Sequence, residues 1–135
     1  MARLLEREGH DVTVIDRNAD SFRRLGDYAG NTVVGTGIDA EVLKKAGIET
    51  ADAFVAVTNG DNTNIMSVQI AKEIFKVPKT LARIYDPVRA AAYKQLGIQT
   101  LCTTSIGAGL MTDLLLDRSP RPVMDYCKIE AEFNL

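Results

Sequence analysis

The clearest candidate for chemistry in this sequence is the acid at Asp16, which ends the short apolar run VTVI at residues 12–15. A run of this length and composition predicts a buried strand. A carboxylate at the carboxyl end of such a strand can accept hydrogen bonds from both hydroxyls of a ribose. The same side chain can instead cap a turn or a helix, so the residues alone leave two interpretations open.

Polar residues stand at the predicted ends of two later strands as well. Thr58 and Asn59 follow the apolar run at residues 53–57, at the edge of a sheet where open α/β folds bind their ligands. They can equally form a plain turn from strand to helix. Arg83 lies near the end of the next apolar run, TLARI, and its charge needs a partner, which either a ligand or the nearby Asp86 could supply.

Short apolar runs alternate along the chain with stripes of helical spacing. Strands are predicted at residues 12–15, 32–35, 53–57, 80–84 and 99–102. Helices are predicted at residues 3–8, 18–25, 41–47, 64–75, 87–96 and 106–116, with Asn18 and Asp39 as caps. Such alternation predicts right-handed crossovers and one parallel sheet with helices on both faces, which is the doubly wound α/β class.

The chain has room for one domain of this class and the start of another, because it contains 135 residues. Residues 1–118 are predicted to form the α/β domain. The breaker sequence SPRP at residues 119–122 predicts a linker, and the strand-like VMDYCKIEAEF that follows predicts the first strand of a C-terminal domain within residues 119–135.

The ribose-binding acid of a Rossmann-type fold normally follows a glycine-rich turn by about 20 residues, but Gly9 is the only glycine before Asp16. We therefore expect the first strand and its phosphate-binding loop to lie before Met1. In the strand order 3-2-1-4-5-6, this leaves the strands at residues 12–15 and 53–57 with unpaired edges. Either these strands pair directly, or another chain donates a strand, or the sequence is a truncated gene model or fragment of a longer protein, which we favour.

Composition limits the classes of partner and the cellular location that we expect for the protein. The formal net charge is -2 and the isoelectric point is near 5.4, with both signs interspersed, so nucleic acid is not an expected partner. No apolar run approaches the roughly 20 residues that span a bilayer, so we expect a cytosolic protein. Cys102 and Cys127 lack metal-ligand spacing, and buried thiols are expected.

The sequence offers little for catalysis. The single histidine, His10, falls in a turn away from the predicted ligand edge, and Tyr93 and Lys94 lack the spacing that places a catalytic pair on one helix face. No serine elbow, zinc-binding helix or Walker loop is present. The protein is not expected to be an enzyme, although an NAD-dependent oxidoreductase remains an alternative because the same fold serves that function.

Three segments together resemble a known family. VTVIDRN, VVGTGIDAEVLKKAGIETADAFVAVTNGDNTNI and AKEIFKVPKTLARIYDP occur in the order found in the TrkA N-terminal domain, also called the RCK or KTN domain. The resemblance covers residues 1 to 116. It implies a regulatory domain that binds NAD or NADH, with ATP or ADP as alternatives, and controls a potassium transporter or channel from the cytoplasmic face of the membrane.

The resemblance also implies which residues bind the nucleotide. The implied cofactor-binding residues are Asp16, Arg17, Asn18, Thr36, Gly37, Thr58, Asn59 and Arg83. Thr36 stands where the family commonly has an acid, and CTTS at residues 102–105 stands where some members have a metal-binding glutamate, so no metal is expected. Binding is expected to be impaired because the phosphate-binding loop is missing from the sequence.

Assembly is implied as well. The family packs its last crossover helix on a second subunit, so a homodimer or larger oligomer is expected through the helix around Ile106, Leu110 and Leu114. The same apolar stripe could instead belong to the core. A nucleotide-free assembly module, which would use this helix and bind no ligand, is therefore a second hypothesis for the whole chain.

Overall fold

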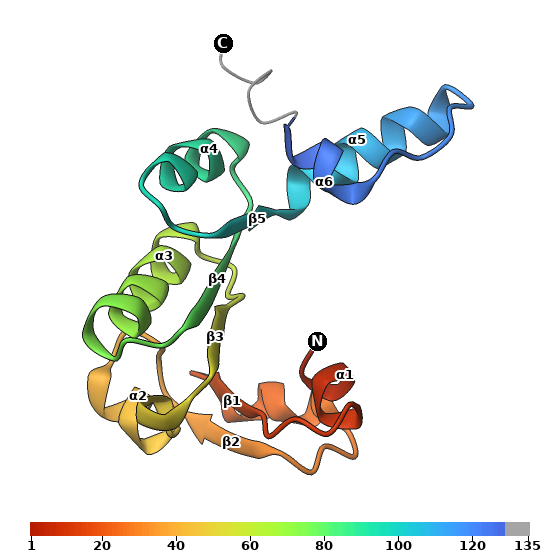
Figure 1. The fold of residues 1–135 in the computed structure, drawn as a ribbon. Coiled ribbons are helices and arrows are strands. Elements are labelled where there is room, and N and C mark those ends of the chain that lie inside the picture. Colours follow the sequence, from red (N-terminus) through yellow and green to blue (C-terminus); the bar gives the residue numbers. More distant parts are fainter. Residues whose placement is uncertain (129–135) are drawn as a thin grey trace.

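The computed structural model describes residues 1–128, in which helices and parallel strands alternate (Figure 1). The strands are β1 (Thr13–Asp16), β2 (Asn31–Val34), β3 (Ala53–Ala56), β4 (Lys79–Ile84) and β5 (Thr100–Cys102). The helices are α1 (Ala2–Arg7), α2 (Ala40–Lys45), α3 (Asp61–Gln69), α4 (Pro87–Gln95), α5 (Thr103–Leu115) and α6 (Val123–Tyr126). Ala19–Leu25 and Ile48–Thr50 are 3-10 turns, and Ile70–Ile74 continues α3 as a π-helical segment. The predicted α/β class is confirmed.

The strands form two parallel sheets rather than the single predicted sheet. One sheet is β1–β2, the other is β3–β4–β5, and the two lie at an angle to each other (Figure 1). Direct pairing of β1 with β3, one of the three ways of closing the fold, is therefore wrong for this structure. Side chains join the two sheets instead, because Ile15 of β1 and Phe54 of β3 pack against one shared apolar cluster. Its buried members are Leu43, Ile48, Ala71 and Val77.

The hydrogen bonds between strands show which backbone N–H and C=O groups of β1 and β3 face away from their partner strands. Val12 O and Asp16 O accept hydrogen bonds from residues of the β2 segment, so every second residue of β1 faces β2. The backbone groups of Thr13 and Ile15 consequently face away from β2. On the other sheet, Ala82 N–H bonds to Gln99 O towards β5, so Leu81 faces β3, and its register partner Val55 turns its own backbone groups away from β4.

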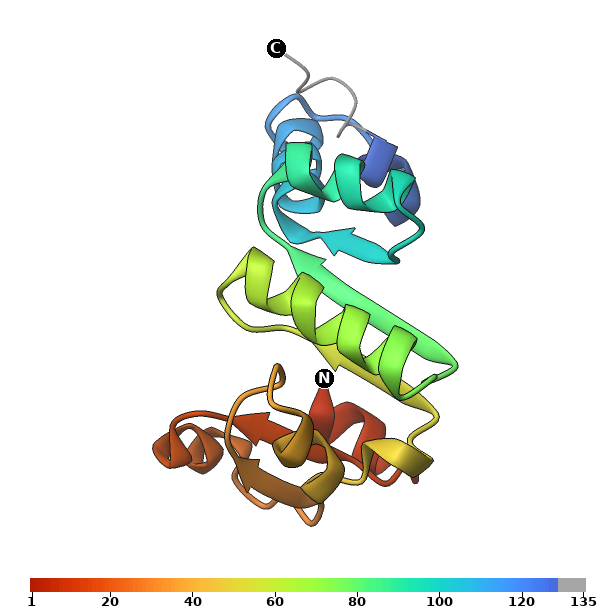
Figure 2. The same cartoon turned by 90° about the vertical axis from the view of Figure 1, so that its left-hand side faces the viewer.

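The larger sheet is covered by α3, which lies across β3 and β4 (Figure 2). The apolar core here contains Ala56, Ile65, Val68, Ala82, Ile84, Ala90, Ile98 and Cys102. The helix begins at Asp61, three residues before its predicted start. Its first turn is polar and carries no apolar stripe, so the apolar pattern could not indicate that turn. Its π-helical continuation ends at Ile74, and Lys76, two residues later, has a φ of 55° in the left-handed region.

The predicted caps are confirmed. Asn18 Oδ1 accepts the N–H of Asp20, and Asp39 Oδ1 accepts the N–H groups of Glu41 and Val42. Such bonds satisfy backbone donors that have no partner inside the helix.

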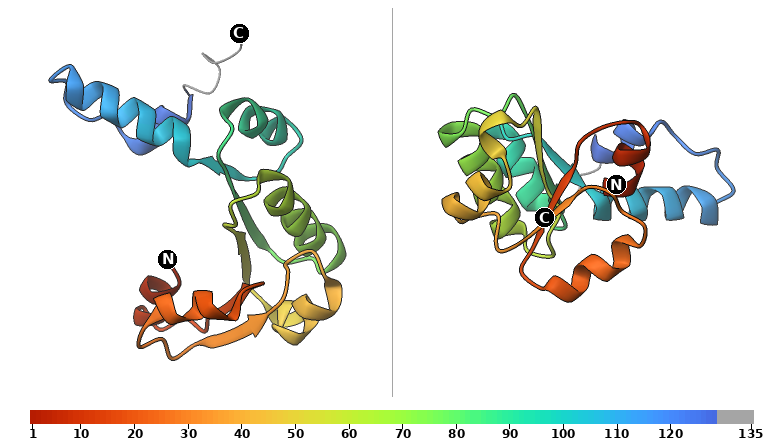
Figure 3. Two further views of the ribbon diagram at one scale, coloured as in Figure 1. Left: turned by 180° about the vertical axis from the view of Figure 1, so that it is seen from behind. Right: turned by 90° about the horizontal axis from the view of Figure 1, so that it is seen from below.

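The last helices form an arm, residues 103–128, in which α5 projects from the end of β5 and α6 lies beside it (Figures 1 and 3). Asp113 of α5 holds α6 and the preceding loop in place within this arm. It is 1% exposed, and it accepts one hydrogen bond from Arg121 Nε at 2.9 Å and another from the Tyr126 hydroxyl at 3.1 Å. Burial acts to raise the pKa of Asp113, but the bonds from Arg121 and Tyr126 and the charges of Arg121 and Arg118 outweigh it and lower that pKa.

This fastening changes the interpretation of the chain after Asp117. Residues 119–122 are not a free linker, because Arg121 binds back to α5. The strand predicted from Val123 is wrong over Val123–Tyr126, which is helical because burial of Tyr126 against Asp113 decides its conformation. The rest of that prediction lies outside the described residues, and the division into two domains stays a prediction. Among residues 1–128, no helix is both long and apolar enough to cross a membrane.

Candidate functional site

The structure places every predicted ligand-binding residue at a carboxyl end of a strand. Asp16, Arg17, Asn18, Thr36 and Gly37 follow or end the strands of the smaller sheet, and Thr58, Asn59 and Arg83 do so on the larger sheet. Open α/β sheets bind ligands at this edge. The two groups differ in how many of their polar atoms are already used within the protein.

Asp16 is half-buried at the end of β1, and its Oδ1 accepts the N–H of Asn18 at 2.8 Å. The carboxylate thus caps the turn, which was the alternative interpretation. Capping uses only part of its capacity, because an ionised carboxylate offers about four acceptor positions. Oδ2 accepts no hydrogen bond from the described residues, so the same side chain can cap the turn and still bind ribose hydroxyls.

The neighbours of Asp16 are less favourable ligands. The Asn18 side chain is committed through its oxygen to the N–H of Asp20. Arg17 is exposed and makes neither an ion pair nor a hydrogen bond with the described residues. Its guanidinium is therefore available to an adenine ring or a phosphate, but nothing in the protein fixes its position.

Gly37 brings the two groups of residues together. A Cβ placed on Gly37 would lie 3.1 Å from Ser67 Oγ and 3.7 Å from the ring of Phe54. The loop after β2 therefore packs directly on α3 and β3, and a larger residue would push it away. Thr36, next to it, uses its hydroxyl weakly, accepting the N–H of Ile38 at 3.4 Å.

The turn after β3 is held by Asn64, whose side chain is fully buried. Asn64 Oδ1 accepts both the N–H and the hydroxyl of Thr58, at 2.9 and 2.7 Å. Its Nδ2 donates to Thr58 O at 3.0 Å and to Arg83 O at 2.8 Å. Thr58 is consequently fixed by its backbone and its hydroxyl, while Asn59 is exposed.

Arg83 lies across the carboxyl end of β3. Its Nη2 donates to Val57 O at 2.5 Å and to Thr58 O at 3.1 Å, and its guanidinium carbon lies 4.8 Å from the ring centre of Tyr85. Its Nε is buried and has no partner among the described residues. Asp86, one of the two partners considered for Arg83, makes no ion pair with it within residues 1–128, because Asp86 caps α4 and contacts Arg89 at 3.6 Å.

Asp61 has a role that the sequence did not indicate. Gly60 is the N-cap of α3, and Asp61 reaches the neighbouring turn. Asp61 Oδ1 accepts the N–H of Tyr85 at 2.8 Å, and Oδ2 accepts the N–H of Asp86 at 3.1 Å. Asp61 and Asn64 together fasten the β3–α3 turn to the end of β4. Their partners lie 19 to 25 residues away, so only an unusual density of polar residues at TNGDNTN could have indicated them.

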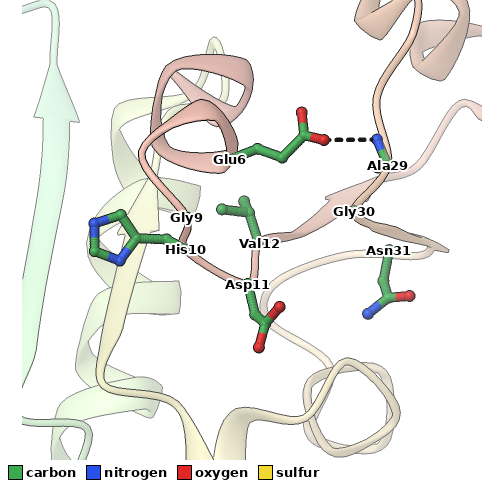
Figure 4. Close-up of a pocket in the computed structure, with 8 residues that line it drawn as sticks. All are labelled: Glu6, Gly9, His10, Asp11, Val12, Ala29, Gly30 and Asn31. Carbon is green, nitrogen blue, oxygen red and sulfur yellow. Dashed lines mark hydrogen bonds between the residues drawn. The ribbon is translucent and has the colours of Figure 1, made fainter.

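A cavity of about 260 Å³ lies at the opposite edge, where β1 and β2 begin (Figure 4). Its polar side chains do not converge. Glu6 Oε1 accepts the N–H of Ala29 at 3.0 Å, while His10 points away from Glu6 and Asn31. Within residues 1–128, no cluster of three histidine, cysteine, aspartate or glutamate side chains could hold a metal ion. We therefore place the candidate site at the carboxyl edge.

Parallel strands that alternate with helices and end in polar turns are typical of a Rossmann-like α/β fold. Solved structures agree on the fold. The TrkA-N domain of the inner membrane protein ybaL from Escherichia coli superposes with a TM-score of 0.71 at 19% identity, covering 84% of each chain. A GsuK channel bound to NAD superposes with a TM-score of 0.65 at 22% identity, covering 82% of this chain and 20% of that one.

Residues 1–104 match the family model of the TrkA-N domain, and the chain belongs to that family. The Trk system potassium uptake protein TrkA of Streptomyces coelicolor is 48% identical over 91% of this chain and 56% of its own length. The TrkA homolog of Pyrococcus abyssi is 37% identical over 71% of this chain and 43% of its own length. The chain thus spans about half the length of the curated relatives it matches.

Proposed function

We propose that this domain senses a nucleotide, NAD or NADH in the first place and ATP or ADP as alternatives, and regulates potassium transport without catalysing a reaction. The observation that carries the proposal is the guanidinium of Arg83 at the carboxyl edge, which bonds to the protein through Nη2 alone and leaves Nη1 without an acceptor among the described residues. A charged donor that the protein leaves unpaired can bind an acidic ligand group through a charge-assisted hydrogen bond. At the carboxyl edge of a Rossmann-like fold, a nucleotide phosphate is the natural acceptor.

The residues fit such a ligand in a definite way. Asp16 would accept the ribose hydroxyls with the oxygen that the turn leaves free. Arg83 would donate from Nη1 to a phosphate oxygen, because its Nη2 is already bound to Val57 O and Thr58 O and its Nε is buried. Gly37, which has no side chain, would let the backbone of its loop approach the nucleotide. The guanidinium of Arg17 would stack on the adenine ring.

Names of related proteins support this choice of ligand and role. Relatives are potassium uptake proteins, and structures with the same fold include a GsuK channel bound to NAD, a GsuK structure bound to ADP and the C-terminal domain of a Shewanella denitrificans Kef protein in an AMP-bound form. We place the domain on the cytoplasmic side of the membrane, bound to the membrane subunit of a potassium transporter or channel.

Pairing with a second copy would use the arm. Of the predicted contact residues, Ile106 and Leu110 are half-buried, whereas Leu114 is 58% exposed. Leu115 is 83% exposed and Met111 61% exposed beside it. Large apolar side chains gathered on one projecting helix are typical of an interaction surface. They also keep the assembly-module hypothesis in view, since they require no nucleotide.

Calorimetric titration tests the proposal. NADH, ATP and ADP would be titrated separately into the wild-type chain, Asp16→Ala, Arg83→Gln and, as a charge-matched control, the exposed Arg24→Gln. We expect at least one nucleotide to bind the wild type and the control alike, and to bind the two site variants roughly tenfold or more weakly, the value of one lost charge-assisted hydrogen bond. Equal binding by all four proteins would refute the site.

The assembly hypothesis has its own readout. Sedimentation of the wild type and of Leu114→Asp/Leu115→Asp separates a dimer from a monomer. If no nucleotide binds the folded wild type and only the arm variant changes its mass, the assembly module is the better description. Nucleotide binding that survives the arm substitutions would favour a sensor whose site is independent of pairing.

A further inference from the structure

Asn64 has no hydrogen-bonding position left for a ligand. It is fully buried in the first turn of α3, and both side-chain atoms make two hydrogen bonds each. The orientation of its amide is fixed by its partners, because only the oxygen can accept the N–H of Thr58 and only the nitrogen can donate to two carbonyls. Any effect of Asn64 on a ligand must therefore pass through another residue.

That residue is Arg83, which Asn64 holds from two directions. The Asn64 amide donates to the backbone carbonyl of Arg83, and it also donates to Thr58 O. The Arg83 guanidinium returns to the same Thr58 carbonyl through Nη2. The three residues thus form a closed ring of hydrogen bonds, in which the position of the guanidinium depends on the turn that Asn64 fixes.

We infer that Asn64 is a positioning residue, which holds the Nη1 donor of Arg83 in place for an acidic ligand group, a phosphate or carboxylate. The inference rests on the proposed function for its ligand, but not for its geometry. Arg83 has a long and flexible side chain, and donors that are held in position before binding lose less conformational entropy when the ligand arrives. Asn64 supplies that order from a site the ligand does not touch.

Two substitutions disrupt the hydrogen bonds of Asn64 in different ways. Asn64→Ala deletes all four hydrogen bonds and frees the Thr58 turn. Asn64→Asp keeps the acceptor for the Thr58 N–H but turns a carboxylate oxygen towards the carbonyls of Thr58 and Arg83, which repels them at neutral pH. At low pH the protonated acid regains one donor, so Asn64→Asp should recover part of the wild-type behaviour. Asn62→Ala is the matched control, because Asn62 is exposed on the same helical turn.

The first readout needs no ligand. In proton–nitrogen NMR spectra of the full chain, the Arg83 Nε–H should give a distinct signal that exchanges slowly with water, assigned by its loss in Arg83→Gln. We expect Asn64→Ala, and Asn64→Asp at neutral pH, to move that signal to the position of exposed arginines, and Asn62→Ala to leave it unchanged. A signal that stays in place in the Asn64 variants would overturn the inference.

The second readout is a double-substitution cycle on NADH affinity. We expect Asn64→Ala to weaken binding roughly tenfold in the wild type but hardly at all in Arg83→Gln, because its effect runs through Arg83. Equal weakening in both backgrounds would show that Asn64 acts on the fold alone. If NADH does not bind the wild type, the proposed function fails for this ligand, while the NMR readout still decides the inference. Should Asn64→Ala not fold, Asn64→Asp replaces it in both measurements.

Discussion

Replacing Asp61 by asparagine separates two roles that the residue could have. If Asp61 capped α3, asparagine would serve as well, since the two are nearly equal as helix caps. In the structure each carboxylate oxygen accepts a backbone N–H of the next turn, from Tyr85 at 2.8 Å and from Asp86 at 3.1 Å. An asparagine has one acceptor oxygen, so its NH₂ group must face one of these N–H donors and leave it unpaired.

The magnitude follows from those contacts. A hydrogen bond to a charged group contributes about 1.5–3 kcal/mol, and Asp61 is 8% exposed, so water replaces the lost bond poorly. We expect Asp61→Asn to lower the free energy of unfolding by about 2 kcal/mol. With a urea m-value of about 1.5 kcal/mol/M, the midpoint should fall by about 1.3 M. That is a large part of the stability of an ordinary domain.

Urea unfolding followed by circular dichroism is the assay. Asp39→Asn is the matched control, because Asp39 is a true N-cap of α2 and asparagine should replace it within about 0.5 kcal/mol. Equal, small effects of the two substitutions would refute the role that we assign to Asp61. A larger loss at Asp39 than at Asp61 would contradict it even more directly.

Three further predictions concern packing, strand edges and pH. Gly37→Ala should destabilise the fold by about 1 kcal/mol in urea unfolding, because its Cβ would lie 3.1 Å from Ser67 Oγ, and an unchanged midpoint would contradict that contact. Val55→Pro should be tolerated far better than Ala56→Pro, because Val55 turns its N–H away from β4 whereas Ala56 donates towards it; thermal melts that rank the two in the opposite order would disprove the register. The lowered pKa of Asp113 stabilises the fold above its ordinary value of 3.8, and that stability is lost as the pH falls through the lowered pKa. Thermal melts between neutral pH and pH 2 should therefore show a steeper acid loss in the wild type than in Asp113→Asn, and parallel curves would count against the fastening.

The sequence predicted those features whose causes are local. The five strands appear close to their predicted places because each contains a short apolar run bounded by polar residues or glycine. Asn18 and Asp39 cap their helices because the donors that they satisfy lie two or three residues away. These features depend on neighbouring residues, and a pattern of neighbours is what a sequence displays.

Features that depend on distant partners were missed. The division into two sheets, in which β1 and β3 do not pair, depends on the backbone edges of these strands, and no pattern of side chains indicates it. The role of Asp61 was missed because its partners at Tyr85 and Asp86 are distant in sequence. Val123–Tyr126 resembled a strand by composition but forms α6, whose Tyr126 donates a hydrogen bond to the distant Asp113.

The candidate site lies between these two cases. Its residues could be identified because the carboxyl ends of parallel strands follow directly from the alternation of strands and helices. Which of their polar atoms already form hydrogen bonds within the protein could not be predicted. Only the structure shows that the turn uses part of the Asp16 carboxylate, and that Arg83 holds Val57 O and Thr58 O while its Nε lacks a partner among the described residues.

The central claim is that a nucleotide binds at the carboxyl ends of the strands. Its most direct test is chemical-shift mapping of the nitrogen-labelled chain during titration with NADH, repeated with ATP. We predict that the shifts concentrate on residues 16–18, 36–37 and 58–60 and on the Arg83 Nε–H. Shifts that gather instead around Glu6, His10 and Asn31, at the opposite edge, or no shifts with either nucleotide, would contradict the account.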